Sequence, residues 1–68
     1  RLVVTNKAYL YDEPSALRHG TTYVMRGDYV KLVRIYPDLR FWEVKFSAYN
    51  GKIIDKWIDC QDIDFCAK

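Results

Sequence analysis

Hydrophobic residues alternate with polar ones in the middle of the chain, a pattern with the period of a β-strand. Trp42, Val44 and Phe46 are separated by charged residues, and successive side chains of a strand point to opposite faces. One face of this segment therefore carries Trp42, Val44 and Phe46, and the other carries Glu43 and Lys45. We expect a half-buried strand whose inner face carries these three side chains.

Shorter apolar runs on both sides of this segment have the same extended character. In residues 29–35, Val30 and Leu32 share one face, whereas Val33 and Ile35 follow in the opposite phase. This change of phase predicts either a β-bulge or a strand buried on both faces. No stretch has the apolar spacing of a helix. We expect strands or extended segments over residues 2–5, 8–11, 21–25, 29–35, 41–49 and 52–58.

Turn-forming residues separate the predicted strands. Asn50-Gly51 predicts a tight hairpin with a type I′ turn, in which both central residues have positive φ. Gly27 predicts a second turn. Pro14 ends the extended segment over residues 8–11. About five or six short strands with such turns predict a compact antiparallel barrel or sandwich. After residue 59 we expect a short 3₁₀ turn and a loose end.

Composition and charge restrict the function without identifying it. The 68 residues suffice for one domain with a thin core, which we place over residues 1–68, with its core at about 3–63 and a C-terminal tail at 64–68. A net charge of +2 and scattered basic residues disfavour nucleic acid as a partner. The longest apolar runs have two to four residues, far short of a membrane span. Because the chain begins with Arg1, we interpret it as a mature protein after leader removal or as a fragment.

Several short motifs follow one another along the chain. In this order and spacing they resemble the bacterial Src homology 3-like domain family. The resemblance covers about residues 3–63 and implies an all-β fold, a small five- to six-stranded, partly open antiparallel barrel with a short 3₁₀ turn near the C-terminus. The motifs are Leu10-Tyr11-Asp12-Glu13-Pro14, Tyr23-Val24-Met25-Arg26-Gly27-Asp28-Tyr29-Val30, Phe41-Trp42-Glu43-Val44, Asn50-Gly51-Lys52 and Trp57-Ile58.

The resemblance also bears on the ligand. Eukaryotic relatives of this family bind polyproline helices in an aromatic groove. Tyr11 matches a groove tyrosine and Phe41 falls at the position of the groove tryptophan. Asp59 and Asp62 stand where those relatives have proline and tyrosine, so half of the groove is missing and we do not expect a polyproline ligand. The bacterial members imply a module of the cell envelope.

Catalytic and metal-binding residues are scarce. A nucleophile needs a base beside it, and the one histidine, His19, lies in a polar, irregular segment. His19, Cys60 and Cys66 have neither the number nor the spacing of zinc ligands. We therefore expect no enzymatic activity, no metal and no cofactor.

The two cysteines have a simpler interpretation. Cys60 and Cys66 can form a disulfide if the tail turns back, closing a loop of about seven residues that stabilises by about 2.4 kcal/mol in the chain-entropy estimate. The alternative is a buried Cys60 and a free, exposed Cys66. A disulfide indicates an oxidising compartment, so we expect a periplasmic or secreted bacterial protein.

Aromatic residues outside the inner face are the candidates for binding. An exposed aromatic cluster marks a contact surface, and we place it in a groove between residues 12–25 and 36–40. Arg34 and Asp62 are additional candidates for orienting a ligand. The predicted ligand-binding residues are Tyr9, Tyr11, Arg18, Tyr36, Arg40, Phe41 and Trp57.

Three hypotheses for the function remain open. The first is a non-catalytic interaction module of the bacterial cell envelope that contacts a protein or a peptidoglycan peptide. The second is a small periplasmic inhibitor or immunity protein that neutralises a toxin or hydrolase by direct binding. The third is an interaction domain whose open sheet edge pairs with another chain or another copy, giving a weak homodimer.

Overall fold

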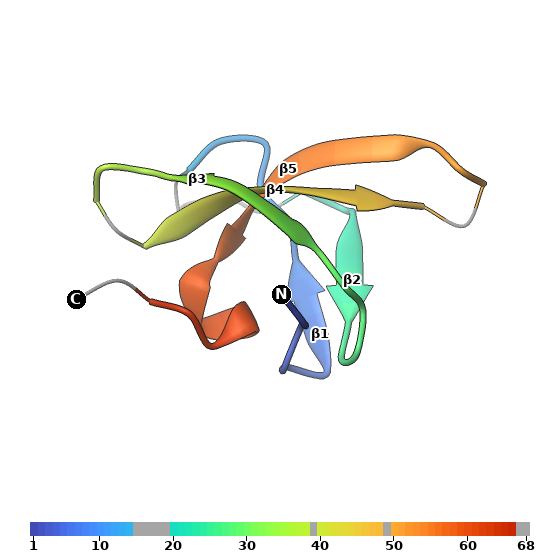
Figure 1. The fold of residues 1–68 in the computed structure, drawn as a ribbon, viewed down its shortest axis with the longest axis horizontal. Coiled ribbons are helices and arrows are strands. Elements are labelled where there is room, and N and C mark those ends of the chain that lie inside the picture. Colours follow the sequence, from blue (N-terminus) through green and yellow to red (C-terminus); the bar gives the residue numbers. More distant parts are fainter. Residues whose placement is uncertain (15–19, 39, 49, 67–68) are drawn as a thin grey trace.

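The computed structural model describes residues 1–14, 20–38, 40–48 and 50–66. It confirms an all-β antiparallel fold with five strands and a 3₁₀ turn near the C-terminus (Figure 1). Within the described residues, no helix has the length and apolar character needed to span a membrane. The elements are β1 (Lys7–Tyr9), β2 (Tyr23–Met25), β3 (Lys31–Ile35), β4 (Phe41–Ser47), β5 (Ile53–Asp59) and the 3₁₀ turn η1 (Cys60–Ile63).

The strands form two sheets instead of one closed barrel. β1 pairs with β2, and the second sheet has the order β3-β4-β5. A bridge joins the two sheets: the Tyr11 and Trp57 N–H groups each donate to the other residue's carbonyl, at 2.8 and 2.9 Å. The tip of the β4–β5 hairpin extends past the β1–β2 pair in Figure 1. The hairpin therefore leaves part of its length uncovered by the smaller sheet.

The predicted bulge is present in β3. The register of β3 against β4 shifts between Leu32 and Arg34. Val33 is 45% exposed, so the alternative of a strand buried on both faces is wrong. The extra residue at the bulge turns Val33 out of the ladder, and the next pair, Arg34 with Glu43, falls on the outer face.

The prediction of a strand over residues 2–5 is wrong. Only a single bridge, between Leu2 and Tyr29, forms there. The Val3 N–H donates to the Asp28 carbonyl at 2.9 Å, whereas the Val4 N–H donates to the Asp62 carbonyl at 2.8 Å. The backbone of this segment thus bonds to a β-turn on one side and to η1 on the other. Because neither partner is a β-strand, the segment cannot form a regular ladder of hydrogen bonds.

The predicted hairpin at Asn50-Gly51 is confirmed, but the prediction of a type I′ turn is wrong. Gly51 has a φ of 83°, while Asp64 is the one non-glycine residue with positive φ among the described residues. The Ala48 N–H donates to the Lys52 carbonyl at 2.9 Å. Three residues therefore lie between the hydrogen-bonded Ala48 and Lys52, with Gly51 in the left-handed position.

Burial of the inner face explains this choice of turn. A type I′ turn at residues 50 and 51 would pair Phe46 with Asp55 and would shift β5 by one residue. Its aspartates would then face the core. The observed register instead pairs Phe46 with Ile54 and Trp42 with Ile58. Hydrophobic burial outweighs the local preference of Asn-Gly.

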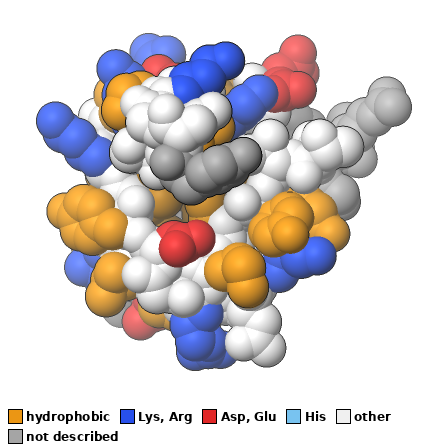
Figure 2. Space-filling view, turned by 90° about the vertical axis from the view of Figure 1, so that its right-hand side faces the viewer, with side chains coloured by type: hydrophobic (Ala, Val, Ile, Leu, Met, Phe, Trp, Pro, Cys, Tyr) orange, Lys and Arg blue, Asp and Glu red, His pale blue; other side chains and the backbone are white. Residues whose placement is uncertain are grey.

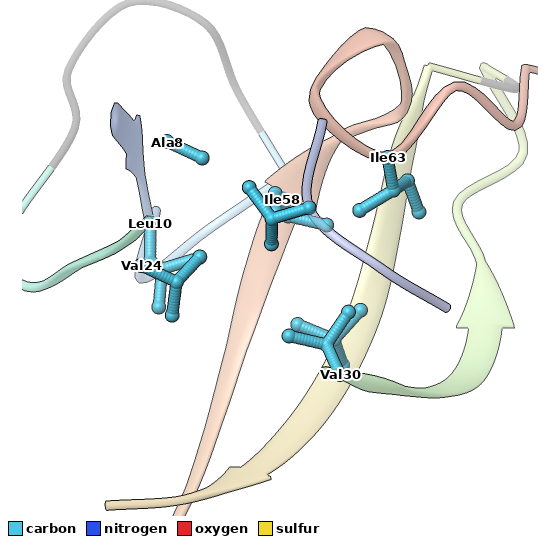
Figure 3. Close-up of a cluster of buried hydrophobic side chains, with 8 residues drawn as sticks. Ala8, Leu10, Val24, Val30, Ile58 and Ile63 are labelled. Carbon is cyan, nitrogen blue, oxygen red and sulfur yellow. The ribbon is translucent and has the colours of Figure 1, made fainter. Parts of the chain in front are cut away.

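The core lies between the two sheets and extends to the N-terminal segment and η1 (Figure 3). Trp42 and Phe46 are half-buried and pack against it, and Val44 is fully buried, as the alternation predicts. The fully or almost fully buried members are Val3, Ala8, Leu10, Val24, Val30, Val44, Ile58 and Ile63.

Residues 64–66 are held against the domain and do not form the expected loose end; residues 67 and 68 lie outside the described residues. Cys60 and Cys66 are joined by a disulfide, with their Cα atoms 4.9 Å apart, as one of the two interpretations of the sequence predicted. The Phe65 ring stacks on Trp42 at 5.4 Å between centroids, and the Trp42 Nε1–H donates to the Phe65 carbonyl at 2.9 Å. Asp64 ends η1 in a left-handed conformation.

Candidate functional site

Most of the predicted aromatic residues meet at one end of the β3-β4-β5 sheet. We call Tyr11, Tyr36, Phe41 and Trp57 the aromatic cluster. The Tyr11 ring meets Phe41 edge to face at 5.1 Å, and the Tyr36 ring meets Trp57 edge to face at 5.9 Å. Edge-to-face packing aligns the positive edge of one ring with the negative face of the other. The four rings are therefore held in defined orientations.

Backbone pairing places these rings on one surface. Phe41 and Glu43 on β4 are opposite Asp59 and Trp57 on β5, so Phe41 and Trp57 share the outer face of the sheet. The bridge to Trp57 brings in Tyr11 from the segment after β1. Three distant parts of the sequence thus contribute to the cluster.

Two arginines flank the cluster. The Arg34 guanidinium lies 5.7 Å from the Trp57 ring centroid, and its Nε–H donates to Glu43 Oε1 at 2.7 Å. Arg40 lies 5.7 Å from the Phe41 centroid, and its Nε–H donates to Asp59 Oδ2 at 3.2 Å. A guanidinium has five N–H donors, so each arginine retains terminal donors that can contact a ligand.

The expectation that Phe41 lines an exposed groove is wrong. Phe41 is 1% exposed, although its position on the strand faces outward. The reason is tertiary: Tyr11, held by its bridge to Trp57, packs its ring against Phe41 on that face. Tyr36 is 40% exposed, and Tyr11 and Trp57 are half-buried. The solvent-facing part of the cluster consists of these three residues and the two arginines.

Other predicted site residues lie elsewhere. Tyr9 belongs to β1, where its ring contacts Tyr23 at 5.7 Å. Lys7 Nζ is 4.3 Å from the Tyr23 ring centroid. Asp62 accepts a hydrogen bond from the Thr5 hydroxyl at 3.2 Å. Arg18 lies outside the described residues, as does part of each loop that would border the predicted groove.

A pair of carboxylates lies on the same sheet face beside Trp57. A hydrogen bond with Asp55 and the ion pair with Arg34 hold the pKa of Glu43 below its ordinary value. Desolvation, and then the hydrogen bond with Glu43, raise the pKa of Asp55. The pair therefore releases the proton of Glu43 first. The negative charge of Glu43 helps to hold Arg34 over Trp57.

The structure reveals a second exposed surface that the sequence analysis did not identify. Tyr29 and Ile53 are 70% and 61% exposed, and both line a groove near the hairpin tip. One signal was available in the sequence. Ile53 and Ile54 are adjacent in a strand, so one of them must face outward. The position of Tyr29, in contrast, depends on the path of the chain between β2 and β3.

No family model, curated protein or solved structure matches this chain.

Proposed function

We propose that this chain is a non-catalytic module of the bacterial cell envelope with a Src homology 3-like fold, which binds a protein or a peptidoglycan peptide. The observation that carries the proposal is the arrangement around Trp57, whose ring packs at nearly a right angle to the Tyr36 ring and lies under the guanidinium of Arg34. Trp, Tyr and Arg are the residues that most often dominate binding energy at interfaces. Rings already held in place lose little conformational entropy when a ligand binds.

The geometry suggests how such a ligand would bind. An apolar side chain would cover the exposed parts of Tyr36 and Trp57. A carboxylate or carbonyl of the same ligand would accept hydrogen bonds from the terminal N–H groups of Arg34 or Arg40. A peptide offers both groups at short separation. Phe41 supports the surface from beneath and does not touch the ligand.

Two further observations support the fold and the location. The long β4–β5 hairpin followed by a 3₁₀ turn agrees with the order of motifs that resembles the family. The Cys60–Cys66 disulfide favours an oxidising compartment such as the periplasm or the cell exterior.

A two-dimensional amide spectrum of oxidised, labelled protein, titrated with soluble peptidoglycan fragments, tests the proposal. We expect saturable shifts at the Trp57 indole and at the amides of Tyr11, Arg34 and Tyr36. Tyr36→Ala should weaken binding by about tenfold or more, the loss expected for a residue at the centre of an interface.

Tyr29→Ala is the matched control, because it removes an exposed tyrosine at the other end of the sheet. It should bind the fragments like the unaltered protein. The absence of shifts at millimolar fragment would exclude a wall peptide and would favour a protein target, as in the inhibitor hypothesis. Equal affinities of Tyr36→Ala and Tyr29→Ala would exclude the aromatic cluster as the site.

A further inference from the structure

A groove lies at the hairpin end of the β3-β4-β5 sheet, away from the aromatic cluster. It has a volume of about 620 Å³ and is lined by Tyr29, Lys31, Lys45, Phe46, Ser47 and Ile53. We call it the hairpin-end groove. It lies where β3 begins and where β4 turns into β5. Figure 2 shows this end of the molecule, where hydrophobic side chains lie around a hollow that an acidic side chain also borders.

The walls of the hairpin-end groove are apolar and accessible. Tyr29 and Ile53 are the two most exposed large hydrophobic residues in the described part of the chain. Phe46 is half-buried and packs against the core, which gives the groove a fixed apolar part. A second groove of about 630 Å³ shares Tyr29 and Phe46 and continues toward Tyr23 and the acidic Asp28. Contiguous apolar surface of this kind marks an interaction site.

The charges of the groove have one sign. Lys31 and Lys45 are directly opposite each other on neighbouring strands, and like charges in this position destabilise a sheet. None of the lining residues is acidic. Asp55 is opposite Lys45 on its other side, and its carboxylate is attracted to that lysine. Lys31, on the edge strand β3, has no acidic residue opposite it among the described residues. A bound anion would offset the repulsion between the two lysines.

The spacing of these groups matches an extended chain. Lys45 and Ser47 are two residues apart on β4, and Ile53 is opposite Ser47. Two residues of a strand span about 7 Å. An extended peptide with a carboxylate at one position and an apolar side chain two positions later presents both groups to one side at that separation.

We infer that the hairpin-end groove binds an acidic, extended peptide segment of a partner protein. Its carboxylate lies over Lys31 and Lys45, and its apolar side chain lies between Tyr29 and Ile53. This site is independent of the aromatic cluster and of the function proposed for it.

Fluorescence anisotropy with the labelled peptide Glu-Thr-Leu-Thr-Glu tests the inference. We expect saturable binding that weakens as NaCl is raised from about 0.05 to about 0.5 M, because salt screens exposed charges. The peptides Lys-Thr-Leu-Thr-Lys and Glu-Thr-Thr-Thr-Glu should bind at least about tenfold more weakly, since each lacks one of the two required groups. Equal binding of all three peptides would overturn the inference.

Variants of the chain locate the site. Lys31→Glu should weaken binding of the acidic peptide by about tenfold or more, and this variant should fold because it replaces a repulsive pair with an attractive one. Lys52→Glu is the matched control: the lysine is exposed and adjacent to Ile53 in sequence but does not line the groove. Its affinity should stay within about twofold, since charges at the rim of a site contribute little.

Tyr29→Ala should reduce peptide binding, whereas Tyr36→Ala should leave it unchanged. This pair separates failure of the inference from failure of the proposed function. Equal effects of Lys31→Glu and Lys52→Glu would show non-specific attraction and would overturn the inference. The inference would also be overturned if the chain bound phosphatidylglycerol vesicles in a Tyr29-dependent way and did not bind the peptide. That result would assign the groove to lipid. Tyr29-dependent self-association in sedimentation would assign it to a second copy of the chain.

Discussion

The two ends of the β3-β4-β5 sheet differ in how their exposed aromatic side chains are held. In the aromatic cluster, Tyr36 packs on Trp57, and Arg34 covers the same indole while paired with Glu43. At the hairpin end, Tyr29 is 70% exposed. The rings of the cluster pack on one another and its two arginines are paired with carboxylates, whereas the hairpin-end groove has exposed apolar walls and two lysines opposite each other. Preorganisation favours specificity at the first, and charge favours rapid capture at the second.

The largest effect that tests this comparison is expected at Phe41. Phe41→Ala removes the fully buried ring of the cluster and should reduce the free energy of unfolding by about 3–5 kcal/mol. A domain of this size has little more stability than that, so the variant should be largely unfolded at room temperature. Urea denaturation followed by circular dichroism measures the loss.

Tyr29→Ala is the comparison for Phe41→Ala. The Tyr29 ring is mostly in solvent. Its removal should therefore change the free energy of unfolding of the domain by no more than about 0.5 kcal/mol. Similar losses in the two variants would contradict the distinction between a supported cluster and an exposed groove.

A second test removes the link between the tail and the body of the domain. Cys66→Ser opens the disulfide and should reduce stability by about 2.4 kcal/mol in the chain-entropy estimate. Both binding surfaces should remain, because neither contains Cys60 or Cys66. The unfolding midpoint in urea and the two ligand affinities are measured together. A variant that is folded but no longer binds would show that the tail shapes a surface.

The smallest expected effect concerns the carboxylates between the two surfaces. The pKa of Asp55 is raised on folding, so the protonated form is favoured and the associated stability is lost as pH rises above the ordinary value of 3.8. Asp55→Asn should therefore gain stability relative to the unaltered protein as pH increases.

Glu43→Gln is the matched variant with the opposite sign. The pKa of Glu43 is lowered on folding, so its ionisation adds stability above the ordinary value of 4.5, and this contribution disappears as pH falls through the lower folded value. The loss caused by Glu43→Gln should be present at neutral pH and vanish in acid. Urea denaturation from acid to neutral pH gives both curves, and parallel curves for the two variants would contradict the assigned order of ionisation.

The elements that the sequence predicted well are those with a local cause. The alternation in residues 41–46 identifies β4 and its inner face. Gly27, with a φ of 90°, occupies the predicted turn before β3. The short spacing of Cys60 and Cys66 limits them to a small loop. Each of these features depends on residues that are close in the chain.

The errors concern features in which distant segments compete. Asn50-Gly51 favours a two-residue turn, yet the apolar face of β5 selects a register with three connecting residues. Phe41 has an outward position on its strand, yet a bridge made by Tyr11 covers it. The first outcome depends on the pairing of the whole of β4 with β5, and the second on a contact between residues 30 positions apart. Neither is contained in a local pattern.

By itself, the sequence determined an antiparallel all-β domain with its hairpin and its apolar face, because strand period and turn chemistry act over a few residues. It left open whether Cys60 and Cys66 are joined, which the structure decided. Only the tertiary structure decided which aromatics are exposed. Burial depends on what lies above a side chain: Tyr11 covers Phe41, whereas the β4–β5 hairpin extends past the smaller sheet and leaves Ile53 open. Both candidate surfaces therefore follow from how the two sheets meet.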